Sequence, residues 1–312
     1  MLALALLATG AFAQEDASPK KWAVVTYSSN FIREEAGYDA EMATQALMGT
    51  VVEVLENKGW TKIRTSEPYV AYVSRSGLKM MTEAEKDAYL EAEKYICTVE
   101  YTHIFTEPDA GSRYVCDFIW GDLVLKTGIK KGKWIKVLIP SGKEGWVLKS
   151  EVQDFRNWVD TREPNGGNIL NTAYKFLGVS YMWGGTSIKH VDCSGLSRSV
   201  YFLNGILLPR NASQQAKVGV EVPYEEAQPG DLIFWGRAAT ADKPERVSHV
   251  TIYMGDDHII HSASNVHISS LRPTEEEDYY NGTRLHVRRI LGNVDNGTGI
   301  TSIAASPYYF KK

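Results

Sequence analysis

The chain has 312 residues, a hydrophobic fraction of 44% and a formal net charge of −4 at pH 7. This length and composition allow two or three globular domains with apolar cores and exclude a disordered chain. The balance of 34 basic against 38 acidic residues excludes the strongly basic surface typical of nucleic-acid binding and a long acidic tail. We therefore expect no nucleic-acid partner.

Residues 1–13 form an apolar segment ending in Ala-Phe-Ala, which is typical of the h-region and cleavage site of a secretory signal peptide. A basic n-region is missing. The segment is too short to span a bilayer, and no later segment is apolar for long enough. No cysteine follows the expected cleavage site, which argues against a lipid anchor. We predict an exported protein, periplasmic or secreted, without stable membrane insertion.

Short strand-like runs broken by Gly, Asn and Asp follow one another from residue 21 to residue 151. This pattern is typical of small all-β barrels. Two units can be distinguished, and both contain a tryptophan just after a glycine in a strand-like run, as in Gly59-Trp60 of the first unit and in Gly132-Lys133-Trp134 and Gly145-Trp146-Val147 of the second. Both units resemble bacterial SH3-like domains, which occur in wall-targeting modules. We assign them to residues 21–80 and 95–155.

A short polar helix is expected between the two units, within a connector at residues 81–94. Thr82 is its expected N-cap, and Glu85 stands three positions on, as in a capping box. In the second unit, Cys97 and Cys116 lie in neighbouring strand-like runs. They either form a disulfide in an oxidising compartment or stay as buried free thiols. In both cases Cys193 is left unpaired.

The best domain boundary is the Pro- and Gly-containing segment at residues 162–167. Beyond it, residues 164–312 begin with a helical run at 168–177, continue through further helices that include one after Asn211, and then become rich in strands. Helices followed by a small antiparallel sheet predict an α+β domain.

Cys193 is the first candidate for chemistry in this last domain. A glycine-rich loop leads into Asp192-Cys193-Ser194-Gly195, and apolar residues then recur at helical spacing. The pattern puts Cys193 at a helix N-terminus, where free backbone N–H groups favour a thiolate and can hold an oxyanion. We interpret Cys193 as a nucleophile. The plainer alternative is a buried structural thiol.

Two histidines are candidates for its partners. His249 and His261 lie in strand-like runs joined by Gly255-Asp256-Asp257, which predicts a hairpin. A three-residue loop would pair Met254 with His258 and bring His249 and His261 to the same face as diagonal neighbours. A one-residue shift in the pairing register would put the two histidines on opposite faces of the sheet.

The C-terminal half resembles the NlpC-type cysteine peptidases, which are papain-like bacterial cell-wall hydrolases. The motifs that carry the resemblance occur in the family's order and are Tyr181-x-Trp183-Gly184-Gly185, Asp192-Cys193-Ser194-Gly195, Arg210-x-x-Ser213-x-Gln215, Gly230-Asp231-Leu232-Ile233-Phe234-Trp235, Ser248-His249-Val250 and Ile260-His261. The whole chain is then two SH3-like barrels followed by an α+β papain-like peptidase domain.

The resemblance implies a Cys193, His249 and His261 triad that cleaves an amide bond without a metal or organic cofactor. His249 would take the thiol proton and His261 would orient His249. The backbone N–H of Cys193 and the Tyr181 hydroxyl would hold the oxyanion. Zinc is the rival use of such residues, but these three lack the closely spaced pairs of zinc sites.

The combination of domains is similar to the YkfC group of γ-D-glutamyl-L-diamino acid endopeptidases. That resemblance implies cleavage of the stem peptide L-Ala-γ-D-Glu-diaminopimelate, with acidic and tyrosine side chains binding the free ammonium of L-alanine. We expect Asp192, Glu41 and either Tyr69 or Tyr72 to do so, because residues three apart in a strand face opposite ways. The other expected substrate contacts are Ser194, Ser213 and Trp183. Ser213 could instead cap a helix, and Trp183 could be only part of a turn. We also expect a monomer.

Three other functions stay open from the sequence. The enzyme could hydrolyse intact peptidoglycan, with the SH3-like units as wall anchors. It could transfer the acyl group to an acceptor other than water. It could also be a non-catalytic wall-binding protein, although all three residues of the triad are retained.

Overall fold

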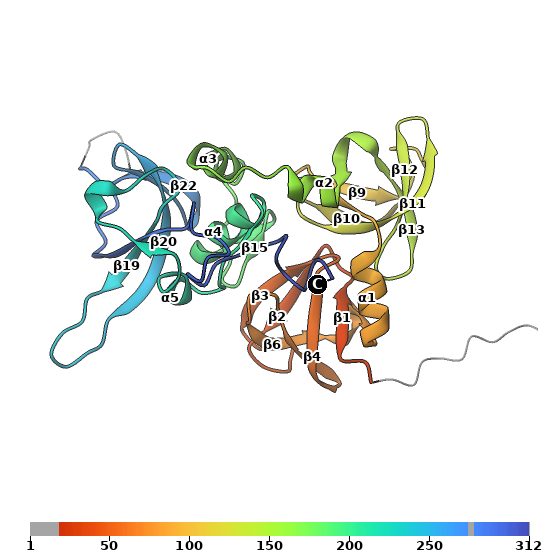
Figure 1. The fold of residues 1–312 in the computed structure, drawn as a ribbon, viewed down its shortest axis with the longest axis horizontal. Helices are drawn as coiled ribbons and strands as arrows, with labels where there is room; N and C mark the ends of the chain where they lie inside the picture. The colour runs from red at the N-terminus through yellow and green to blue at the C-terminus, as the bar shows by residue number, and fades with distance from the viewer. Residues whose placement is uncertain (1–18, 274–277, 312) are drawn as a thin grey trace, which may run out of the picture.

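The chain folds into two small β domains and one α+β domain, as the computed structural model of residues 19–273 and 278–311 shows (Figure 1). The predicted fold class is confirmed. The segment interpreted as a signal peptide, residues 1–13, lies outside the described residues. Within the described ranges, no helix has both the length and the apolar character needed to cross a membrane.

The first β domain is a seven-stranded antiparallel sheet in the order β3-β2-β6-β5-β4-β1-β7. Its core is small and aliphatic and includes the fully buried Ile32, Val52 and Ile63. The strands are β1 (Trp22–Val25), β2 (Ser29–Arg33), β3 (Met42–Leu47), β4 (Val51–Lys58), β5 (Trp60–Arg64), β6 (Val70–Ser74) and β7 (Leu78–Met81), with a 3₁₀ turn η1 (Arg75–Gly77) before β7.

The second β domain repeats the strand order of the first, since β10-β9-β13-β12-β11-β8-β14 is the same pattern shifted by seven. Its 3₁₀ turn η2 (Lys149–Glu151) also precedes the last strand. The glycine and tryptophan pattern shared by the two units thus reflects a repeated topology. The strands are β8 (Lys94–Cys97), β9 (Tyr101–Phe105), β10 (Tyr114–Ile119), β11 (Leu123–Lys131), β12 (Trp134–Leu138), β13 (Glu144–Leu148) and β14 (Val152–Asp154).

Helix α1 (Glu83–Glu91) connects the two β domains. Its capping box is formed as predicted, because the Glu85 N–H donates to Thr82 Oγ1 and the Thr82 N–H donates to Glu85 Oε2. The helix is not only a solvated connector. Tyr89 and Leu90 are buried against the first β domain, and the Tyr89 hydroxyl donates to the carbonyl of Gly49 at 2.9 Å.

In the α+β domain, helices α3 and α4 pack beside a six-stranded sheet in the order β18-β23-β19-β20-β21-β22. Its apolar core includes the buried Phe176, Tyr201 and Phe234. The helices are α2 (Phe155–Asp160), α3 (Gly166–Tyr174), α4 (Cys193–Phe202), α5 (Ala212–Gln215) and the 3₁₀ turn η3 (Tyr224–Glu226). The strands are β15 (Thr186–Ser187), β16 (His190–Val191), β17 (Ile206–Leu207), β18 (Val220–Glu221), β19 (Leu232–Arg237), β20 (Arg246–Gly255), β21 (His258–Ala263), β22 (Asn265–Ser270), β23 (Arg284–Arg289) and β24 (Thr301–Ser302).

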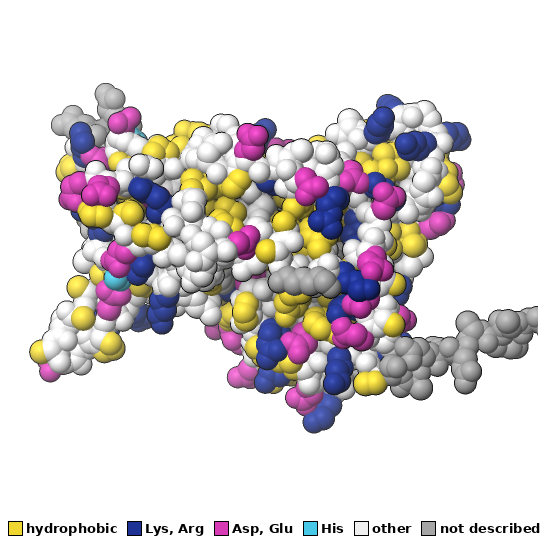
Figure 2. All heavy atoms as spheres, viewed as in Figure 1, with side chains coloured by type: hydrophobic (Ala, Val, Ile, Leu, Met, Phe, Trp, Pro, Cys, Tyr) yellow, Lys and Arg dark blue, Asp and Glu magenta, His cyan; other side chains and the backbone are white. Residues whose placement is uncertain are grey.

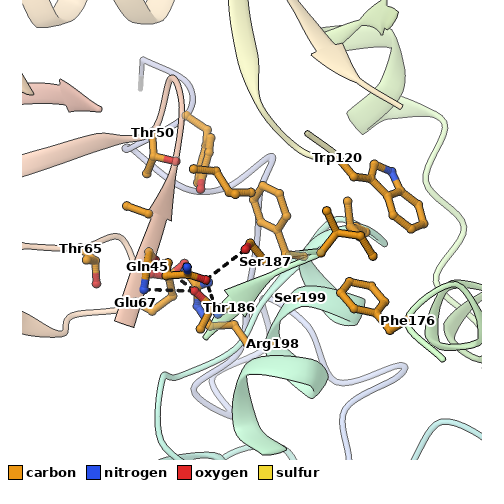
Figure 3. Close-up of a pocket in the computed structure, with 16 residues that line it drawn as sticks. Gln45, Thr50, Thr65, Glu67, Trp120, Phe176, Thr186, Ser187, Arg198 and Ser199 are labelled. Atoms are coloured by element: carbon orange, nitrogen blue, oxygen red, sulfur yellow. Dashed lines mark hydrogen bonds and ion pairs between the residues drawn. The ribbon is translucent and has the colours of Figure 1, made fainter. Parts of the chain in front are cut away.

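The first β domain is joined to the α+β domain by a hydrogen-bonded seam between β3 and β15. Gln45 is 2% exposed, and its Oε1 accepts from the Thr186 N–H at 2.9 Å and from Ser187 Oγ at 3.0 Å (Figure 3). A crevice with room for about one water molecule, about 20 Å³, lies beside this seam. The buried ion pair of Arg198 and Glu67, at 2.7 Å, closes its edge. These contacts fix the first β domain against helix α4.

The C-terminal segment returns to the first β domain (Figure 1). Tyr308 packs edge-on against Trp22 with ring centroids 5.9 Å apart, and Phe310 stacks on Phe155 at 5.2 Å. Lys311 pairs with Glu91 of α1 at 2.6 Å. The last residues therefore hold the first β domain, helix α1 and helix α2 together.

All three cysteines are free, so the Cys97–Cys116 disulfide considered above is not formed. Cys97 is fully buried and its Sγ donates to the carbonyl of Val99 at 3.4 Å, while Cys116 is half-buried in the same core. The alternative of free thiols in the core of the second β domain is the one observed.

We predict that the junction between the two β domains depends on Gly49. Its φ is +83°, and a Cβ there would lie 2.5 Å from Leu123 Cβ, next to the hydrogen bond from the Leu123 N–H to the carbonyl of Met48. Gly59 has nearly the same φ, +80°, but open space around it. Gly49→Ala should lower the free energy of unfolding by roughly 3 kcal/mol, and Gly59→Ala by about 1 kcal/mol from backbone strain alone. Equal losses in thermal or urea unfolding would show that the contact contributes nothing.

Candidate active site

Helix α4 begins directly at Cys193, as the sequence predicted. Asp192 is the N-cap, and its Oδ1 accepts from the Gly195 N–H at 2.7 Å. The backbone N–H groups of Ser194 and Val250 point toward the sulfur and act to lower the pKa of the thiol. Burial and the Asp192 carboxylate act more strongly in the opposite direction, and the pKa of Cys193 is raised to about 11. The resting residue is therefore a neutral thiol.

Asp192 has a structural role in the site. Its side chain is 7% exposed and pairs with Arg210, which is 4% exposed. The carboxylate also accepts from the N–H of Gly184 at 2.9 Å and from Ser194 Oγ at 3.2 Å. Its charge is already compensated within the protein, but Asp192 also lines the catalytic cavity, and its contact with a substrate ammonium stays a prediction. The same holds for Ser194, which lines the cavity and whose hydroxyl accepts from Arg210 at 3.0 Å.

The two predicted histidines meet across the sheet, with His249 Nε2 and His261 Nδ1 2.9 Å apart. The hairpin register is the predicted one, since Ile252 pairs with Ile260 and Tyr253 with Ile259. The loop differs. It is a two-residue turn with positive φ at Asp256 and Asp257, and a bulge at Met254 supplies the odd residue, so Met254 does not pair with His258. The bulge keeps His249 and His261 on one face.

A hydrogen-bonded chain extends beyond the two histidines. His261 Nε2 lies 2.9 Å from Ser269 Oγ, and the Ser269 hydroxyl donates to Asp278 Oδ2. The Asp278 carboxylate can only accept a hydrogen bond, and this sets the direction of the whole chain. Ser269 donates to Asp278, His261 Nε2–H donates to Ser269, and His249 Nε2–H donates to His261 Nδ1. His249 is left with Nδ1 as its free base. Neither Ser269 nor Asp278 was predicted from the sequence.

Burial keeps both rings neutral at pH 7. It lowers the pKa of His249 to about 4, with a smaller contribution from His267, and the pKa of His261 to about 3, with contributions from His249 and His267. Tyr280 stacks on His249 with ring centroids 5.5 Å apart. A neutral His249 can accept the Cys193 proton, and the chain that ends at the Asp278 carboxylate can stabilise the resulting cation.

The same region could bind a metal ion. Ligand atoms of His261, His267 and Asp278 lie within 4.8 Å of one another. The hydrogen bonds through Ser269 already engage His261 and Asp278, and His267 Nε2 lies 3.3 Å from Asp278 Oδ2. The geometry therefore favours an orienting chain over a metal centre.

Cys193 and His249 line a cavity of about 430 Å³ that residues of the first β domain help to enclose. Tyr181, Ser213 and the 60% exposed Trp183 also line it, as predicted. Ser213 does not cap α5, because Asn211 holds the N-cap position. The lining is completed by Glu34, Ala43, Tyr69, Asp192, Ser194, Arg210, Asn211, Ala212, Arg246, Val247 and Ser248.

Of the three first-domain residues expected at the cleft, only Tyr69 lines it. Tyr72 lies elsewhere on the sheet, with Lys62 over its ring. Glu41 is exposed outside the cleft, and its carbonyl accepts from the Glu34 N–H at 3.0 Å. Glu34 is the acidic residue at the cleft, where Tyr69 donates a hydrogen bond of 2.7 Å to its carboxylate. Glu34 follows β2 with no distinguishing local pattern, so only the docking of the domains reveals it.

Comparisons with known proteins follow this division of the chain. The sequence profile described as the NlpC/P60 family matches residues 178–289, and that of the bacterial dipeptidyl-peptidase Sh3 domain matches residues 32–78. A γ-D-glutamyl-L-lysine dipeptidyl-peptidase from Bacillus cereus is 30% identical over 234 residues, covering 71% of this chain and 67% of the relative.

Two further comparisons extend over most of the chain. Dipeptidyl-peptidase 6 from Lysinibacillus sphaericus is 24% identical over 248 residues, covering 76% of this chain and 87% of the relative. The crystal structure of an NlpC/P60 family protein from Bacillus cereus superposes with a TM-score of 0.70 at 24% identity, covering 86% of this chain and 99% of that one. The latter likeness shows that the three-domain fold is shared.

The raised pKa of Cys193 gives a test that needs no substrate. Only the thiolate is alkylated, so the iodoacetamide rate at Cys193 should rise about tenfold per pH unit from pH 6 to 9. The rate should be followed on the Cys193 peptide by mass spectrometry, because Cys97 and Cys116 are also free. The unfolded protein is the control and should level off near pH 9, at the ordinary thiol value. A plateau between pH 5 and 8 in the folded protein would instead indicate a resting thiolate paired with protonated His249.

Proposed function

Because this chain belongs to the NlpC/P60 family of cysteine peptidases, we propose that it hydrolyses the γ-D-glutamyl–diaminopimelate bond of cell-wall stem peptides with a free N-terminal L-alanine. Its role is then the recycling of released stem peptides. Export through residues 1–13 belongs to the same proposal. The relatives named as γ-D-glutamyl-L-lysine dipeptidyl-peptidases support the bond class.

The observation that carries the proposal is the Glu34 and Tyr69 pair at the cleft. A carboxylate on a first-domain wall compensates the charge of an α-ammonium brought into a closed site. Tyr69 stays protonated, because burial and the hydrogen bond to Glu34 raise its pKa to about 12. A stem peptide that is still linked to a glycan chain has no ammonium at this position. The side of the cleft that carries Glu34 therefore selects peptides with a free amino end.

The reaction follows from the directed hydrogen bonds at His249. Its Nδ1 takes the Cys193 proton as the sulfur attacks the γ-carbonyl carbon of D-glutamate. The Cys193 N–H and the Tyr181 hydroxyl stabilise the oxyanion. The Tyr181 hydroxyl keeps its proton and stays a hydrogen-bond donor, since burial raises its pKa to about 12. His249 returns the proton to the leaving amine, and water, deprotonated by His249, then hydrolyses the thioester.

We predict that cleavage requires the free amine. L-Ala-γ-D-Glu-diaminopimelate should be cleaved, and its N-acetylated form should lose at least about 100-fold in kcat/KM, since the carboxylate is left unpaired. Glu34→Gln should lose roughly tenfold to 100-fold on the free peptide, mainly in KM. Glu41→Gln, an exposed carboxylate outside the cleft, is the matched control and should change nothing.

Product analysis by mass spectrometry beside Cys193→Ala checks this prediction. Equal cleavage of the free and acetylated peptides would favour hydrolysis of intact peptidoglycan. Absence of any Cys193-dependent cleavage would favour a non-catalytic wall-binding protein or transfer to another acceptor.

We predict that Ser269 acts as a positioning residue through His261. Ser269→Ala interrupts the chain to Asp278 and should lower kcat about tenfold while leaving KM unchanged, because the substrate does not contact Ser269. Ser270→Ala is the matched control, since Ser270 is the next residue of β22 and is as deeply buried, at 2% exposed against 1% for Ser269, and its hydroxyl accepts only from the Arg272 N–H among the described residues. A loss in KM, or an equal loss in both variants, would indicate a merely structural effect. Ser269→Thr keeps the hydroxyl and should restore part of the lost kcat.

A further inference from the structure

A β-bulge in β20 brings a basic side chain to the cleft. Trp235 pairs with His249, but the next residue of β19, Gly236, pairs with Val247, so Ser248 is the extra residue. Side chains alternate along a strand, and Arg246 would face away from His249 without this extra residue. With it, Arg246 lies on the same face as His249, and both line the catalytic cavity.

Arg246 stands directly opposite another arginine. Arg237 is its cross-strand partner, and like charges in this arrangement are destabilising. Neither arginine forms an ion pair with a carboxylate within the described part of the chain. Arg237 donates only to the carbonyl of Pro244, at 3.2 Å. The nearby Glu245 is engaged by His286 at 2.8 Å. The two guanidinium groups therefore lack an anion.

Arg246 also joins the catalytic cavity to two neighbouring cavities. It lines the catalytic cavity, a second cavity of about 420 Å³ with Arg237 and Tyr280, and a third of about 440 Å³ with Lys217 and Arg288. These hollows lie along β20 and the β19–β20 hairpin, which projects from the α+β domain in Figure 1. Lysine and arginine side chains lie beside that hairpin in the space-filling view (Figure 2). The cleft thus continues on its β20 side toward Arg237, Lys217 and Arg288, and Glu245 and His286 also line the third cavity.

The direction of the substrate follows from the two ends of the cleft. Glu34 and Tyr69 stand where the first β domain encloses the catalytic cavity, and under the proposed function they bind the amino end. The residue that leaves after cleavage must then extend toward the continuing cavities, which share Arg246. A diamino acid in that position carries carboxylate groups, and arginine binds carboxylates in a bidentate manner.

We propose that Arg246, assisted by Arg237, binds a carboxylate of the leaving diamino acid and so determines which third residue of the stem peptide is accepted. The inference rests on the proposed function and names a specificity residue for it. Two carboxylates could make this contact. One is the side-chain carboxylate of diaminopimelate, which lysine lacks. The other is the α-carboxylate, which diaminopimelate and lysine both carry when they end the peptide. The two sources make different predictions.

The test compares three peptides with the wild-type chain and three variants. The peptides are L-Ala-γ-D-Glu-diaminopimelate, L-Ala-γ-D-Glu-L-Lys and L-Ala-γ-D-Glu-L-Lys-amide, which carry two, one and no carboxylates on the third residue. The variants are Arg246→Gln, Arg237→Gln and the matched control Arg113→Gln, an exposed arginine of the second β domain. The amide reports on folding and catalysis within each variant, because it offers no carboxylate to Arg246.

We expect Arg246→Gln to lose roughly tenfold to 100-fold in kcat/KM on the diaminopimelate peptide and to keep full activity on the amide. Arg237→Gln should show a smaller loss of the same kind, and Arg113→Gln none. An unchanged lysine peptide assigns the contact to the side-chain carboxylate, whereas an equal loss on the lysine peptide assigns it to the α-carboxylate.

Unchanged activity on all three peptides, or an equal loss on all three, would overturn the role of Arg246 while leaving the proposed peptidase intact. The absence of Cys193-dependent cleavage of every peptide by the wild-type chain would overturn the proposed function itself, and this inference with it.

Discussion

The buried ion pair between Asp192 and Arg210 is the interaction on which the site depends. Burial of two charged side chains is costly unless their remaining donors and acceptors are also hydrogen-bonded. Here each of these additional hydrogen bonds positions part of the site. Asp192 caps α4 and holds the loop at Gly184, while Arg210 Nε donates to the carbonyl of Ala43 in the first β domain at 3.1 Å. A single pair thus fixes the helix that carries the thiol, the loop before it and the wall of the cleft.

Two copies of one strand order serve different purposes in this chain. The first β domain donates residues to the cleft, whereas the second packs its Trp120 beside Phe176 of the α+β domain, with ring centroids 6.2 Å apart. The difference comes from the edge that each presents. In the first domain, Gln45 and Ala43 of β3 meet β15 and Arg210, so the outermost strand of that sheet becomes part of the active-site wall.

Local sequence information was sufficient for the elements that carry Cys193, His249 and His261. A cap followed by helical periodicity marks α4, and the alternation of two strands with an odd offset puts both histidines on one face. The offset was predicted correctly and its cause was not, because a bulge at Met254 cannot be distinguished from a longer turn by composition. Glu34, Ser269 and Asp278 could not be found this way. Glu34 acquires its position from the docking of two domains, and the other two from a hydrogen-bonded chain between strand and loop. The pairing of Asp192 with Arg210, 18 residues later, could not be found from local sequence either.

Specificity in such a cleft depends on which charges are left without a partner. Asp192 and Arg210 both line the cavity and compensate each other's charge. Glu34 has only the neutral Tyr69 hydroxyl as a side-chain partner among the described residues, and Arg246 faces another cation. An extended ligand with an ammonium at one end and a carboxylate at the other would satisfy both, with its central amide near Cys193. Under the proposed function, the arrangement of unpaired charge at the two ends of the cleft, and not Cys193, His249 and His261 themselves, sets which peptide is preferred.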